Sequence, residues 1–190
     1  LGLIGIGRSA ADAAVAADIG EAWARTLLAA EAVGRFDPVD EADTFNMEYW
    51  SLEQAKLGKG VEKPLARHVV LVTGGGGAIG AATARAFAAA GAEVAVLDRD
   101  PEAAAAAALS LAADVNDPAA VRAAIGGVAA RFGGLDIVVS NAGAAWTGAI
   151  ADLAAADLRA CFELNFFAHQ SVSQAAMAVF RAQNGGGALP

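Results

Sequence analysis

Apolar and polar positions divide the chain into two parts with different patterns. From His68 onward, short apolar runs alternate with longer stretches in which apolar residues recur at helical spacing. We expect strands over 68–73, 92–98, 107–115 and 135–141, and helices over 78–91, 117–134 and 151–187. Strands that alternate with helices indicate βαβ units. The sequence therefore predicts an α/β fold, a Rossmann-like doubly wound parallel sheet.

The first part of the chain predicts a mainly helical segment. "LGLIGIG" is expected to form a short buried strand, and Ser9 to cap a helix that ends at Gly34. A polar loop over 35–46 and an amphipathic helix over 47–59 follow.

A linker is expected next, because "GKGVEKPLAR" (58–67) combines glycine, proline and mixed charge. We therefore predict one domain over 1–64 and another over 65–190. Within the second domain, the connection from Asp98 to Asp114 is short for a helical crossover. Either its helix is stunted or residues are missing there.

Composition argues against several classes of function and site. The net charge of −8 argues against a nucleic-acid surface, which needs a basic face. No apolar stretch is long enough to span a membrane. The lone Cys161 excludes an internal disulfide and favours a reducing, cytoplasmic location. His68 and His169 lie far apart without a Cys or carboxylate cluster, so no metal site is expected.

The run of four glycines, 74–77, lies between a predicted strand and a predicted helix. Gly75, Gly77 and Gly80 satisfy G-x-G-x-x-G, the pattern of a dinucleotide phosphate site. The first glycine would permit the turn, the second would let the backbone approach the diphosphate, and the third would let helix and strand pack closely. A purely steric role for these glycines is the alternative.

The next predicted strand ends in an acidic residue, Asp98. A carboxylate there can bind the ribose hydroxyls of adenosine and repel a 2′-phosphate, although a solvated strand end is an equal alternative. Arg99 could instead accept a 2′-phosphate. Together, the glycine loop and Asp98 favour NAD as cofactor, with NADP as second choice, and Arg99 weakens this preference.

Four motifs in this order resemble the short-chain dehydrogenase/reductase family. They are "TGGGGAIG" (73–80), "DV" (114–115), "NAG" (141–143) and "LNFF" around Asn165. The resemblance implies that the sheet is incomplete and lacks the family's C-terminal strands. It also implies a cofactor-binding set and one supporting catalytic residue, Asn165. The cofactor-binding set is Thr73, Gly74, Gly76, Gly77, Ile79, Gly80, Asp98, Arg99, Asp114, Val115, Asn141, Ala142 and Gly143.

Each motif residue also has a structural alternative. Asp114 could be an exposed strand end or the cap of the following helix, Asn141 could satisfy backbone groups without a ligand, and Asn165 could bond a neighbouring residue. The family's catalytic Ser and Tyr-x-x-x-Lys are not found, since the single tyrosine, Tyr49, has Glu53 four residues later. We therefore expect nucleotide binding without turnover from residues 1–190.

The first part resembles the tail of the aldolase in bifunctional class II aldolase/short-chain dehydrogenases of deoxysugar breakdown. The carrying stretch is "FNMEYWSLEQAKLGK". This resemblance implies rhamnulose-1-phosphate cleavage and lactaldehyde oxidation in a longer parent; a generic helical extension is the alternative.

Two other hypotheses stay open: a dinucleotide-binding module without catalysis, and a fragment without an independent role. The resemblance also implies a small-molecule substrate and a homodimer or homotetramer. The apolar side chains of 152–183 would serve mainly as core, with the rest as a self-associating face.

Overall fold

The chain forms two compact units, Leu1–Lys63 and Pro64–Pro190, which are described separately. The computed structural model describes residues 2–50, 63–100 and 107–183. The division lies next to the predicted boundary, and the assignment of the two parts to different domain types stays a prediction. No helix in the described residues is long and apolar enough to cross a lipid bilayer.

The first unit contains two helices, α1 (Ala10–Val33) and α2 (Glu41–Glu48). As predicted, Ser9 caps α1, because its hydroxyl oxygen accepts a hydrogen bond from the Asp12 amide at 3.1 Å. Gly34 ends the helix, and its amide donates a hydrogen bond to the Ala30 carbonyl.

Two predictions for this unit are wrong. The segment before α1 forms no strand among its described residues, and Leu3, Ile4 and Ile6 are exposed rather than buried. Gly5 and Gly7 pack against the helix, where a Cβ on Gly5 would lie 2.1 Å from the Ala13 oxygen. Without a neighbouring strand, nothing supplies the hydrogen-bond ladder that a strand requires. The second helix begins at Glu41 inside the expected loop, because Asp40 accepts from the Asp43 amide and caps it there. The rest of the predicted helix and linker, 51–62, lies outside the described residues.

The second unit is built on a four-stranded, all-parallel sheet. Its strands are β1 (Val69–Thr73), β2 (Glu93–Asp98), β3 (Leu109–Ala112) and β4 (Ile137–Val139). The spatial order is β3-β2-β1-β4. This confirms the predicted Rossmann-like fold. The predicted short crossover between β2 and β3 involves 101–106, which lie outside the described residues.

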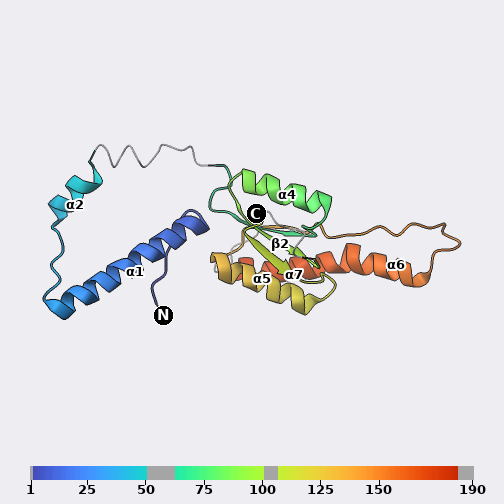
Figure 1. The fold of residues 1–190 in the computed structure, drawn as a ribbon. Helices are drawn as coiled ribbons and strands as arrows, with labels where there is room; N and C mark the ends of the chain where they lie inside the picture. The colour runs from blue at the N-terminus through green and yellow to red at the C-terminus, as the bar shows by residue number, and fades with distance from the viewer. Residues whose placement is uncertain (1, 51–62, 101–106, 184–190) are drawn as a thin grey trace. The chain divides into compact units, whose positions relative to one another are not determined.

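Helices cover both faces of the sheet, as Figure 1 shows for α4 (Ala78–Ala89) on one side and α5 (Pro118–Phe132) and α7 (Ala168–Gln183) on the other. Alternate residues of β1 point to opposite faces. Val70 and Val72 belong to the core cluster that includes α4, and Leu71 to the one that includes α5 and α7. Burial on both faces explains the unbroken apolar run of β1.

The predicted helix over 151–187 is divided into three segments. α6 (Ala155–Phe162) runs into a π-helical turn, η2 (Glu163–Phe167), and then into α7. Within the turn, the Ala168 amide donates to the Glu163 carbonyl, five residues earlier. A single π turn inside an α-helix adds one residue to that turn, which periodicity alone did not reveal.

Candidate functional site

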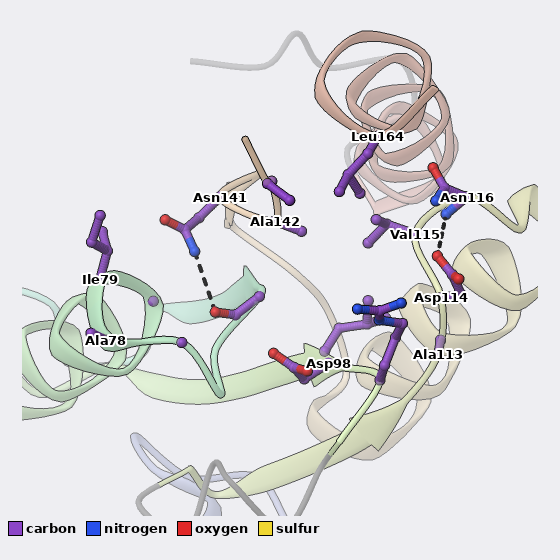
Figure 2. A pocket seen from close by; sticks show the side chains of 17 residues that line it. Ala78, Ile79, Asp98, Ala113, Asp114, Val115, Asn116, Asn141, Ala142 and Leu164 are labelled. Carbon is purple, nitrogen blue, oxygen red and sulfur yellow. Dashed lines mark hydrogen bonds between the residues drawn. The ribbon is translucent and has the colours of Figure 1, made fainter. Parts of the chain in front are cut away.

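A pocket of about 510 Å³ opens at the carboxyl ends of the strands, within the usual size range of small-molecule sites. Figure 2 shows side chains from several elements around it, including Asp98, Asp114, Asn141 and Leu164. Its lining residues are Gly74, Gly77, Ala78, Ile79, Gly80, Leu97, Asp98, Arg99, Ala113, Asp114, Val115, Asn116, Asn141, Ala142, Gly143, Ala144 and Leu164.

The sheet topology explains why a pocket forms there. From β1 the chain proceeds to β2 and β3 on one side, and then returns to β4 on the other side of β1. The connections after β1 and β4 therefore leave the sheet in opposite directions. Ligands of open α/β sheets bind at this switch point.

The turn after β1 depends on Gly74, whose φ of 66° lies in the left-handed region. The sequence pattern assigned this turn to Gly75, which is wrong. Gly75 is needed for another reason, since a Cβ there would lie 2.2 Å from a Val96 methyl carbon. Gly74 thus provides the turn, and Gly75 allows the loop to pack against β2.

Gly80 in α4 allows the helix to approach the loop closely. A Cβ on Gly80 would lie 2.1 Å from the Gly74 carbonyl oxygen and 2.8 Å from Asn141 Nδ2. This agrees with the close-packing role predicted for the last glycine of the motif.

Gly77 differs from Gly80 because no atom in the described part of the chain requires its lack of a side chain. A Cβ there would meet only the Gly74 oxygen, at 3.4 Å. Gly77 is the N-cap of α4 and no side chain caps the helix. The first amides of α4 therefore face the pocket without a side-chain acceptor, an arrangement suited to an anion such as a diphosphate.

Asp98 closes the β2 side of the loop. Its Oδ2 accepts from the Gly76 amide at 2.8 Å, and its Oδ1 accepts from the Asp100 amide at 3.1 Å. The half-buried carboxylate still lines the pocket, beside the exposed Arg99. The carboxylate is thus oriented by two backbone amides while it lines the pocket.

The segment after β3 supplies Asp114, Val115 and Asn116. Asp114 Oδ1 accepts from the Asn116 amide at 2.9 Å (dashed in Figure 2), and Val115 is buried. The alternative that Asp114 caps α5 is wrong, because Asp117 accepts from the amides of Ala119 and Ala120.

Asn141 connects the segment after β4 to the glycine loop. Its Nδ2 donates to the carbonyl oxygens of Thr73 at 3.0 Å and Gly74 at 3.3 Å. The buried Thr73 hydroxyl accepts from the amides of Asn141 and Ala142, at 2.9 and 3.0 Å. Asn141 thus satisfies backbone groups, as its structural alternative proposed, and also forms a pocket wall.

Asn165, in the π turn, holds the other end of that wall. Its Nδ2 donates to the Ala144 carbonyl at 2.8 Å and to Cys161 Sγ at 3.3 Å, and its Oδ1 accepts from the Ala144 amide at 3.2 Å. A Cβ on Gly143 would lie 2.8 Å from Asn165 Oδ1. Gly143 is therefore a glycine because the asparagine approaches it.

Most of the predicted site residues lie together in the pocket lining; Thr73, Gly76 and Asn165 do not line it but hydrogen-bond to residues that do. The predicted set omitted six lining residues, namely Ala78, Leu97, Ala113, Asn116, Ala144 and Leu164. Each of them directly adjoins a predicted residue in the chain, and Ala78 and Leu164 lie inside the quoted motifs. Across the described ranges, no three His, Cys, Asp or Glu side chains gather as a metal site would need.

Two family models match the chain. The model described as short chain dehydrogenase matches residues 68–189, and the model described as aldolase class II, second domain, matches residues 1–57. The first match covers more than half of the chain.

Several known proteins are similar to the chain. An uncharacterized oxidoreductase, YuxG, of Bacillus subtilis is 33% identical over 158 residues, covering 76% of this chain and 23% of its own length. D-threitol dehydrogenase of Mycolicibacterium smegmatis is 37% identical over 107 residues, covering 51% of this chain and 41% of its own. A crystal structure of a short chain dehydrogenase from Burkholderia cenocepacia in complex with NADP is 41% identical with a TM-score of 0.56, covering 59% and 50% of the two chains.

The chain thus spans half or less of the length of these proteins. The match to the Bacillus oxidoreductase covers a larger share of this chain than the second unit contains, so it extends into the first unit.

Proposed function

Because the chain belongs to the short chain dehydrogenase family, we propose that its second unit is the cofactor-binding part of an NAD-dependent oxidoreductase. The observation that supports this most is the open space above Gly77, where uncapped helix amides face a pocket that no side chain of the described residues fills. A dinucleotide diphosphate has the charge and the acceptor oxygens that this position requires.

The strand order suggests how the dinucleotide would lie. Asp98 and Asp114 follow β2 and β3 on one side of β1, and Asn141 follows β4 on the other. With the diphosphate over the β1 loop, adenosine would lie toward Asp98 and Asp114, and the nicotinamide riboside toward 141–144. The bound nicotinamide would supply hydride-transfer chemistry, while these residues bind and orient it.

NAD is preferred to NADP in this proposal because of the Asp98 carboxylate. A 2′-phosphate on the adenosine ribose would come close to a negative charge, whereas two ribose hydroxyls could donate to it. The exposed guanidinium of Arg99 offsets part of that repulsion.

Titration of the protein with NADH and NADPH tests both the pocket and the preference. We expect NADH to bind more tightly, and Asp98→Ala to weaken NADH about tenfold while weakening NADPH less, which would reduce or reverse the preference. The matched control is Asp100→Ala, which removes a carboxylate two residues away and leaves the amide that bonds Asp98. Absence of binding of either nucleotide to the wild-type protein would refute the proposal.

For the whole parent protein, we propose an enzyme that oxidises a small sugar-derived hydroxy or aldehyde compound, with lactaldehyde as the first compound to test. Relatives named as oxidoreductases and dehydrogenases favour an enzyme over a binding module without catalysis. In this proposal Asn165 positions the pocket wall next to the reacting carbon.

The first unit would be the tail of an aldolase-like domain fused to the dehydrogenase, in a parent that also cleaves rhamnulose 1-phosphate. The family match over 1–57 and the extended match to the Bacillus oxidoreductase support this assignment. The exposed apolar residues of α1, including Ile19, Trp23 and Leu28, are what a domain fragment would present to the rest of its domain. We also propose a cytoplasmic location.

Self-association is proposed for the apolar surface of α6 and η2. Leu158, Phe162, Phe166 and Phe167 are all exposed, and the last two rings pack edge to face. We expect a dimer or tetramer at micromolar concentration by light scattering, and a shift toward monomer in Phe162→Glu/Phe166→Glu. Val33→Glu, at an even more exposed apolar position in the other unit, should leave the assembly unchanged. A wild-type monomer would contradict this proposal.

A further inference from the structure

A hydrogen bond outside the pocket joins the segment after β4 to helix α7. Ser140 Oγ lies 2.6 Å from His169 Nδ1, and both side chains are partly buried. A hydroxyl can donate to an unprotonated ring nitrogen or accept from a protonated one, so either tautomer of His169 maintains the bond. Neither residue lines the pocket.

The segment that this bond holds has no regular structure of its own. β4 ends at Val139, and residues 140–149 form neither helix nor strand. The position of 141–144, the pocket wall beyond β1, is therefore determined by the side chains that contact it. Thr73 holds its start from the glycine-loop side, and Asn165 holds its end.

Ser140 is the residue immediately before this wall, and His169 lies four residues after Asn165. Residues four apart share one face of a helix, so η2 and the start of α7 present two polar side chains to the same segment. One contacts Ala144 and the other contacts Ser140. The segment is thus fixed at both ends by one helical region.

We propose that His169 is a positioning residue for the nicotinamide side of the cofactor site, acting through Ser140. The proposal rests on the dinucleotide-binding function inferred above and adds a residue that touches no ligand. Loss of the bond would free the start of 141–144 from α7, while the β2 and β3 side of the pocket, with Asp98 and Asp114, would remain as it is.

α7 itself does not depend on this contact. The Gln183 side chain bonds both the amide and the carbonyl of Leu135, at 2.6 and 2.8 Å, and Val172 and Phe180 are buried in the core. Substitution of His169 should therefore leave the helix in place.

The test compares NADH, which would reach 141–144, with ADP, which lacks the nicotinamide riboside. We expect His169→Ala and Ser140→Ala each to weaken NADH about tenfold and to change ADP affinity less than about twofold. The double variant should lose no more than either single variant, because the two residues share one interaction. His169→Asn, whose amide can take the place of Nδ1, should restore most of the NADH affinity.

Any one of three results would overturn the proposal. The variants could weaken NADH and ADP equally, the losses could add up in the double variant, or both single variants could keep their NADH affinity. Amide hydrogen exchange without nucleotide provides an independent reading. His169→Ala should accelerate amide exchange at Asn141, Ala142 and Ala144 but not at 69–73. Unchanged exchange at all three amides would also overturn the proposal. If the wild-type protein binds neither nucleotide, the proposed function fails, and hydrogen exchange still decides the role of His169.

Discussion

Replacement of Gly80 by alanine is expected to abolish nucleotide binding and to lower the free energy of unfolding by about 2 to 3 kcal/mol. The added Cβ would lie 2.1 Å from the Gly74 carbonyl oxygen, and that neighbour is backbone that cannot rotate away. α4 would have to move from the loop, which would displace both the turn at Gly74 and the helix amides that face the pocket. Denaturant unfolding and NADH titration measure the two effects.

The matched control is Gly126→Ala in α5. Gly126 is also inside a helix, but a Cβ there meets no atom within 4 Å. Alanine should therefore stabilise the protein by about 0.5 to 1 kcal/mol through helix propensity. If the two variants behave alike, the close approach of α4 to the glycine loop is not what makes Gly80 necessary.

The second large effect is expected for Thr73→Val. Valine has the shape of threonine but leaves the amides of Asn141 and Ala142 without their acceptor. Unpaired donors in a partly buried position cost about 1 to 3 kcal/mol each, so we expect the two donors together to lower the unfolding free energy by about 2 to 6 kcal/mol. NADH affinity should fall more than tenfold because the wall at 141–144 would move away from the loop.

Thr73→Ser separates the hydroxyl from the methyl group. Serine keeps the acceptor and loses one buried methyl, so it should cost about 1 kcal/mol and leave NADH binding nearly unchanged. A serine variant as damaged as the valine variant would show that packing of the methyl group, rather than the hydrogen bonds, is the main contribution of Thr73.

Local motifs predicted the parts of the site whose chemistry lies in a single stretch of chain. The glycine loop, Asp98 and Asn141 each follow a strand, and parallel strands bring their carboxyl ends to one edge. The pattern assigned the left-handed turn to Gly75 instead of Gly74, because a spacing rule does not state which glycine has a positive φ. Gly75 is required for a different reason, because Val96 occupies the space that a Cβ would take.

Contacts between distant residues could not be predicted in the same way. Ser140 and His169 are 29 residues apart, and Asn165 meets Ala144 across 21 residues. No motif records such pairs, since they arise from the packing of α7 on the sheet. The strand predicted for "LGLIGIG" was wrong for a related reason: apolar character suits either a strand or packing against a helix, and only the neighbouring elements decide between them.

The π turn at 163–167 places the apolar residues before it and after it on different sides of the helix. In an unbroken α-helix, residues 18 apart lie on the same side after five full turns. Phe162 and Phe180 have this spacing, yet Phe162 is 55% exposed and Phe180 only 6%. One inserted residue rotates the preceding part of the helix by about 100° relative to the following part. If residues 163–167 formed regular α-helix at the same length, the two phenylalanines would lie on one side of the helix and the Asn165 amide would move away from Ala144.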